Sequence, residues 1–133
     1  MSTMRKRKLG ALKPTRAERG IAAIEMAVAA PILVVMLIGI VEFGRYYNAS
    51  ISVTHAAREA VRKVALGDSA GASGAAVTAA NPVSVSVGSM VACPATGIGN
   101  ASITINSSFT FDALIVGLGS KTITRTAVMR CGG

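Results

Sequence analysis

Two residues that could take part in chemistry lie where the longest apolar stretch of the chain begins. Gly20 ends a basic segment, and Glu25 is the single ionisable side chain between Ile21 and Val41. A carboxylate near the start of a membrane helix costs a few kcal/mol on insertion scales, so it usually has a partner or a role. The alternative is that Glu25 reaches back to the inner interface, favoured by the positive end of the helix dipole. The spacing therefore predicts either a paired or an interfacial carboxylate.

The apolar stretch itself predicts a single membrane-spanning helix within residues 21–44. A helix from Ile21 to Val41 covers roughly 31 Å at about 1.5 Å per residue, close to the thickness of the hydrocarbon core. The residues after this stretch form a poor signal-peptidase site, so we expect the helix to remain as an anchor. Charged and tyrosine side chains then reappear together and predict the far membrane interface, with an ion pair between the first two: Glu42, Arg45, Tyr46 and Tyr47.

The positive charge of the chain is concentrated before the span. The formal net charge is +8 over 133 residues, and residues 1–20 hold seven basic side chains against the single acidic Glu18. Positive charge beside a span keeps that end of the protein in the cytoplasm. Nucleic-acid binding is the weaker interpretation, because this basic leader has no aromatic ring to stack on a base. We therefore expect a cytoplasmic N-terminus and a C-terminal domain, from about residue 45, on the other side of the membrane.

The residues on both sides of the span resemble those of a known family. Residues 19–25, Arg-Gly-Ile-Ala-Ala-Ile-Glu, resemble the prepilin peptidase site of type IV pilin-like proteins. The span closes with Gly-Ile-Val-Glu-Phe-Gly-Arg at 39–45, and Ala-Ala-Arg-Glu-Ala-Val-Arg follows at 56–62, with Thr-Ala-Val-Met-Arg at 126–130. In this order the stretches resemble the TadE-like minor pseudopilins of tight-adherence (Tad, or Flp) pilus systems.

The resemblance implies a structural, non-enzymatic role in pilus assembly. It implies cleavage between Gly20 and Ile21 by a prepilin peptidase, in the cell inner membrane, with the C-terminal domain periplasmic or extracellular. Glu25 would then act in assembly, where its carboxylate can pair with the new α-ammonium of a neighbouring subunit. The expected partners are other pilins or pseudopilins and the Tad assembly platform. The alternative is an uncleaved single-pass envelope protein that serves as a binding module or assembly scaffold.

Beyond the span we expect an α+β domain of the type IV pilin-like class. Residues 45–66 contain neither proline nor glycine, so the helix is predicted to continue with an amphipathic outer half, its apolar stripe formed by Val53, Ala57, Ala60, Val61 and Val64. Gly67 and Asp68 are predicted to stop it. Residues 67–133 are predicted to form a small antiparallel sheet of three or four strands on this helix, with strands at 83–87, 102–106 (extending to Phe111) and 121–129.

Cys93 and Cys131 are the only cysteines, and both lie in the part expected outside the cytoplasm. An even count in an oxidising compartment predicts a disulfide between them. Two thiols without a nearby histidine are too few for a structural zinc site, so we expect no metal.

The sequence contains no constellation that predicts catalysis. His55 is the single histidine, and Ser52 and Glu59 lie three and four residues from it. Such trios arise by chance on exposed helices, so we expect no catalytic residue, no cofactor and no small-molecule substrate. An enzyme tethered to the membrane is therefore the least favoured interpretation.

Overall fold

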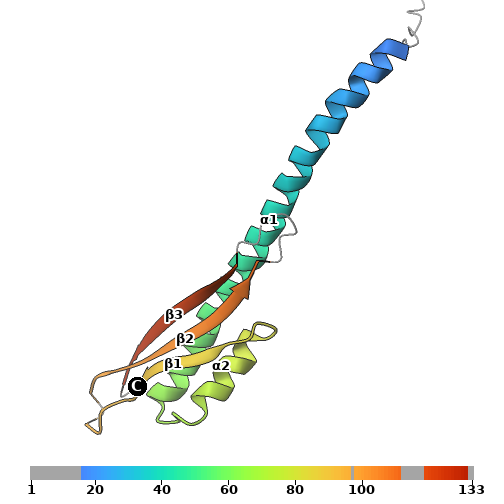
Figure 1. Ribbon diagram of the computed structural model, residues 1–133. Coiled ribbons are helices and arrows are strands. Elements are labelled where there is room, and N and C mark those ends of the chain that lie inside the picture. The colour runs from blue at the N-terminus through green and yellow to red at the C-terminus, as the bar shows by residue number, and fades with distance from the viewer. Residues whose placement is uncertain (1–15, 97, 112–118, 132–133) are drawn as a thin grey trace, which may run out of the picture. The chain divides into compact units, whose positions relative to one another are not determined.

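The computed structural model describes residues 16–96, 98–111 and 119–131, with the side chains from residue 20 onward (Figure 1). The basic residues 1–15 of the leader lie outside the described part of the chain. The chain divides into two units, residues 1–37 and residues 38–133, here called the N-terminal unit and the C-terminal unit.

The N-terminal unit contributes the first half of helix α1, which runs from Arg16 to Ala65 and contains Pro31. Ile21 is 68% exposed, and nearly all side chains from residue 20 to residue 37 are exposed as well. The stretch from Gly20 to Ala65 includes a segment long and apolar enough to cross a membrane. A helix that is apolar all round and finds no core within its own chain is typical of a membrane span.

The second half of α1 belongs to the C-terminal unit and presents one apolar stripe to the core. The five predicted stripe residues are all buried, and Ala49 and Ala56 join them. They recur at three- and four-residue steps, which places them on one face of a helix. The predicted continuation of the helix beyond the apolar stretch, with its amphipathic stripe, is therefore confirmed.

Helix α1 ends in a Schellman motif. Gly67 has a φ of +84°, the left-handed conformation that glycine adopts at low cost. The N–H of Asp68 donates to the carbonyl of Lys63 at 3.0 Å, and the N–H of Gly67 donates to the carbonyl of Val64 at 3.1 Å. The predicted stop at Gly67 and Asp68 is confirmed, and a short helix, α2 (Ala72–Ala80), follows it.

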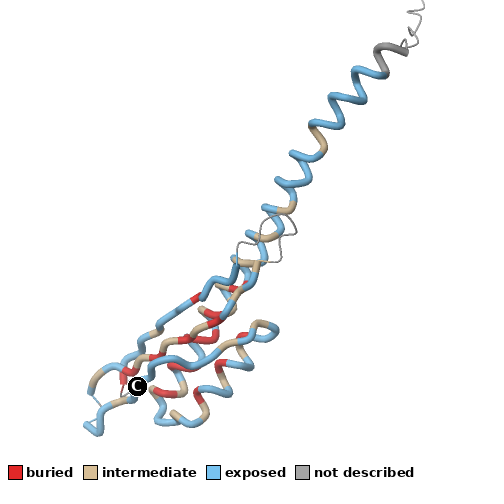
Figure 2. Tube along the Cα trace, in the orientation of Figure 1, coloured by how far each residue is buried: buried red, intermediate tan, exposed pale blue. Residues whose placement is uncertain are grey.

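Three strands form one antiparallel sheet in the order β1-β2-β3: β1 (Ser86–Val91), β2 (Asn100–Thr110) and β3 (Ser120–Arg130). Strand β2 alternates between buried and more exposed residues, because successive side chains of a strand point to opposite faces. The buried positions in Figure 2 lie on the sheet, on α2 and on the second half of α1. The α+β fold with a long N-terminal helix is confirmed.

The first strand differs from its predicted position. The alternating valines at 83–87 predict a strand there, but residues 83–85 precede the sheet and β1 extends through Gly88 to Val91. The β1–β2 register shifts between Val87 and Met90, and a Cβ at position 88 would lie 3.3 Å from the carbonyl oxygen of Thr104. Gly88 therefore continues the strand through an irregularity that a larger residue would obstruct. The strand predicted at 83–87 is wrong in its limits.

The alanines of the α1 stripe set how closely the helix approaches the sheet. Ala60 is fully buried in the core that Ile103 and Ile105 also form. We expect Ala60→Leu to lower the free energy of unfolding by about 1–3 kcal/mol, because the larger isobutyl side chain of leucine has no space in a closely packed core. Urea unfolding of the full chain in detergent micelles, followed by circular dichroism, measures this. The control His55→Leu adds bulk on the exposed side of the same helix and should change the value by less than about 0.5 kcal/mol; equal effects of the two variants would contradict the prediction.

Candidate functional site

The Gly20–Ile21 bond lies near the beginning of α1. Both residues are helical and exposed, and a Cβ at Gly20 would meet no atom within 4 Å. The first four N–H groups of a helix have no helical acceptor, and in α1 these belong to residues 16–19. Glycine is also about 1 kcal/mol less favourable than alanine within a helix. The bond therefore follows directly after the least stabilised turn of α1.

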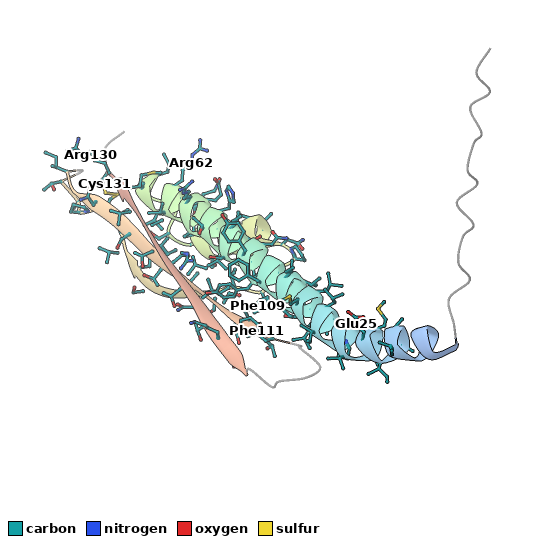
Figure 3. All side chains as sticks on the ribbon, turned by 90° about the horizontal axis from the view of Figure 1, so that it is seen from above. Glu25, Arg62, Phe109, Phe111, Arg130 and Cys131 are labelled. Atoms are coloured by element: carbon teal, nitrogen blue, oxygen red, sulfur yellow. A yellow bond between two sulfur atoms is a disulfide. The ribbon has the colours of Figure 1, made fainter. Side chains whose placement is uncertain are left out.

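Glu25 lies one helical turn beyond Ile21 and shares a helix face with it. Its side chain is exposed in the isolated chain (Figure 3), and within the described part of the protein it forms neither a hydrogen bond nor an ion pair. Its neighbours Ile24 and Met26 are also exposed. If this segment lies in a bilayer, no described side chain of the protein offers Glu25 a charge partner there.

Glu42 and Arg45 form the predicted ion pair, with 2.8 Å between Glu42 Oε1 and Arg45 Nη1. The Glu42 side chain is only 12% exposed, and its second oxygen, Oε2, is buried without a hydrogen-bond partner among the described residues. The Arg45 guanidinium also lies 5.9 Å from the centre of the Phe109 ring. The pair therefore links the outer half of α1 to the end of β2.

Tyr46 and Tyr47 have different environments. Tyr46 packs against Phe109 and Phe111, with ring centres 5.6 Å and 5.9 Å away, whereas Tyr47 is 61% exposed. Figure 3 labels the two phenylalanines. Sequence reasoning assigned both tyrosines to a membrane interface and missed this aromatic cluster. The alternation of Phe109 and Phe111 around Thr110 was the available signal, because it places both rings on one face of the strand.

A disulfide joins Cys93 to Cys131, as predicted, with 5.7 Å between the Cα atoms. Cys131 is buried, and its N–H donates to the carbonyl of Gly99 at 2.9 Å. Cys93 Sγ lies 3.7 Å from the carbonyl oxygen of Ala65, the last residue of α1. The bond therefore holds the end of β3 beside the end of the long helix.

Ser52, His55 and Glu59 are not joined by hydrogen bonds in the described part of the chain, and His55 is exposed. Among the described residues, no group of three or more His, Cys, Asp or Glu side chains is placed to hold a metal ion.

Comparison with known proteins gives one match. Residues 20–62 match the family described as TadE-like protein, a region that begins at Gly20 and includes Glu25, the Glu42–Arg45 pair and most of the buried stripe. No curated protein and no solved structure matches the chain. The resemblance found in the sequence is confirmed over this region.

Proposed function

We propose that this chain, whose residues 20–62 match the TadE-like family associated with Tad pilus systems, is a minor pseudopilin-like structural component of pilus biogenesis. Helix α1 anchors it in the inner membrane with the leader in the cytoplasm, and the C-terminal unit lies on the periplasmic or extracellular side. A prepilin peptidase removes the leader after Gly20. The protein works by assembly with other pilins or pseudopilins and the assembly platform, without catalysis. The observation that carries the proposal is the Gly20–Glu25 spacing at the start of an apolar helix within the family match.

The distribution of charge supports the proposed orientation. Seven basic side chains precede Gly20, whereas the residues after it are nearly balanced in charge. Basic residues beside a span are retained in the cytoplasm. Cleavage after Gly20 would remove this charge and leave a much less basic protein whose first residue belongs to the membrane helix.

The environment of Glu25 supports a role in assembly. Cleavage creates an α-ammonium at Ile21, and a carboxylate and an ammonium that are both desolvated stabilise each other when they meet. Glu25 has no partner among the described residues of its own chain. Packing of several α1 helices in a pilus would therefore give each carboxylate a neighbour of opposite charge.

Mass spectrometry of the membrane-bound protein tests the processing step. In cells with an active prepilin peptidase, we expect the mature chain to begin at Ile21, and in cells without it at the original N-terminus. Gly20→Leu should block cleavage because it adds a side chain at the scissile bond, whereas Gly39→Ala, in the same helix and also in open surroundings, should be cut normally. If the chain stays uncut in the presence of the active peptidase, the processing step is wrong. The alternative function, an uncleaved single-pass envelope protein that serves as a binding module or assembly scaffold, would then remain.

A further inference from the structure

Strand β3 forms one edge of the sheet. It pairs with β2 on one side, and no described strand pairs with its other side. The ladder is regular, and at its two ends Phe111 N donates to Gly119 O and Cys131 N donates to Gly99 O. Hydrogen-bonded and non-hydrogen-bonded pairs alternate in an antiparallel ladder, so the odd-numbered residues of β3 direct their main-chain groups to β2. The even-numbered residues, including Thr126, Val128 and Arg130, therefore direct theirs to the open edge.

Two adjoining grooves follow this edge along helix α1. One, of about 250 Å³, is lined by Thr54, Ala57 and Arg58 of α1 and by residues 125–128 of β3. The other, of about 190 Å³, is lined by Arg62, Ala65 and Leu66 of α1 and by Met129 and Arg130 of β3. We call the two together the α1–β3 groove. Figure 3 shows Arg62 and Arg130 at the same end of the C-terminal unit.

Four arginines line the α1–β3 groove: Arg58, Arg62, Arg125 and Arg130. Arg125 is engaged, since it donates to the carbonyl of Thr124 at 2.9 Å and to Ser50 Oγ at 2.6 Å. The side chains of the other three form no ion pair or hydrogen bond with any described residue. Arg125 already occupies the carbonyl of Thr124, which lies on the open edge. The segment with unoccupied main-chain groups therefore runs from Thr126 to Arg130.

The acidic side chains that the structure describes in the same unit lie elsewhere. Glu59 lines a different groove with Lys63 and α2, and Asp68 lies 3.8 Å from the Lys63 ammonium. The α1–β3 groove therefore combines unpaired main-chain donors and acceptors with uncompensated positive charge. An extended peptide can pair with the main-chain donors and acceptors of the edge, and acidic side chains on that peptide can pair with the arginines.

We infer that the α1–β3 groove is a docking site for an extended acidic segment of a different protein, which adds a fourth strand beside residues 126–130 of β3. A second copy of this chain does not fit. Its five acidic residues after Gly20 are all isolated in the sequence, and two β3 edges brought together would place arginines against arginines. The inference goes beyond the proposed function and holds whether or not the leader is removed.

Binding of a labelled probe peptide to the full chain in detergent micelles tests the inference. The probe is a ten-residue peptide of alternating glutamate and valine, measured by fluorescence anisotropy. We expect it to bind, and we expect the double variant Arg58→Gln with Arg62→Gln to weaken binding by about tenfold or more, since two charge-assisted contacts are lost. Lys121→Gln, at the other end of β3, removes one charge outside the groove and should change affinity less than twofold.

Two further measurements distinguish strand addition from general attraction of anions. The same peptide with alternate amides N-methylated retains its charge but lacks main-chain donors, and it should lose binding. Val128→Pro removes one N–H from the open edge while leaving the β2 ladder intact, and it should also lose binding. The inference is overturned if the probe does not bind, if the arginine variants bind it unchanged, or if the methylated peptide or inorganic polyphosphate binds as tightly. The last result would identify a polyanion or lipid-headgroup surface instead.

Discussion

Replacing Cys93 and Cys131 together by serine is expected to lower the free energy of unfolding of the C-terminal unit by about 4 kcal/mol. The disulfide spans 38 residues, and in the chain-entropy model the cost of losing it grows with the length of the closed loop. The closed loop includes β2 and β3 in full, and Cys131 lies immediately after β3. The C-terminal unit is small, so this loss is a large fraction of the 5–15 kcal/mol that is typical of folded domains.

Urea unfolding of the full chain in micelles, followed by circular dichroism, measures the loss. Wild-type protein under reducing conditions should shift to the same midpoint as the double serine variant, and the double variant should not respond to reductant. Ala95→Ser, in the same loop and exposed, is the matched control and should leave the midpoint unchanged. A double variant that loses less than about 1 kcal/mol would show that the contacts of β3 hold its end without the covalent bond.

Hydrogen exchange should locate the same effect within the fold. Without the disulfide, the amides near Arg130 at the end of β3 should lose protection first, because the bond holds this end beside the end of α1. The arginines of the α1–β3 groove come from α1 and β3. Loss of the disulfide should therefore also lower the affinity of the groove for the probe peptide. The stability of the domain and its docking site are therefore connected through one bond.

The long helix could be predicted from the sequence because its signals are local. The apolar stretch shows its length directly, the stripe from Val53 to Val64 follows the helical period, and Gly67 marks the end through its own backbone conformation. The pairing of the cysteines was also accessible, because a chain with two cysteines allows one intramolecular disulfide.

The first strand was predicted incorrectly because its limits depend on another strand. The alternation at residues 83–87 is real, yet Val83 and Val85 pack against the core before β1 joins the sheet. Gly88 reads as a strand end when taken alone, whereas a Cβ at this position would lie 3.3 Å from the carbonyl oxygen of Thr104, so glycine leaves room for β1 to continue. Propensity cannot anticipate such a contact, because it is made between residues 16 positions apart.

The arginine groove was missed for a similar reason. Arg58 and Arg62 lie within the helix predicted over residues 45–66, but Arg125 and Arg130 lie more than 60 residues away in the sequence. Only the order of strands in the sheet brings the two pairs to one edge. The sequence shows these charges but not their common position in the fold, whereas Gly20 and Glu25 could be proposed as sites from the sequence because both lie within one short segment.

Replacing Glu25 by alanine is expected to separate membrane insertion from assembly. Without the carboxylate, the helix inserts at least as well as before, because a charged side chain within a span costs about 2.5–3.5 kcal/mol on insertion scales. In an assembled pilus the loss of the carboxylate is unfavourable, because the α-ammonium at Ile21 of a neighbouring subunit would be buried without its charge partner. Removing one partner of a buried ion pair costs about 3–5 kcal/mol. The variant should therefore remain in the membrane and be cut after Gly20, yet be missing from the pilus fraction.

Cell-envelope fractionation before and after shearing measures both effects on the same culture. Glu25→Gln keeps the size of the side chain and should fail in the same way, which assigns the effect to charge instead of packing. Glu59→Ala removes an exposed carboxylate farther along the same helix and should assemble normally. If Glu25→Ala enters the pilus fraction at the wild-type level, Glu25 is an interfacial residue and α1 acts as an anchor. If both Glu25 variants are cut but remain in the membrane, α1 is the element through which the subunits assemble.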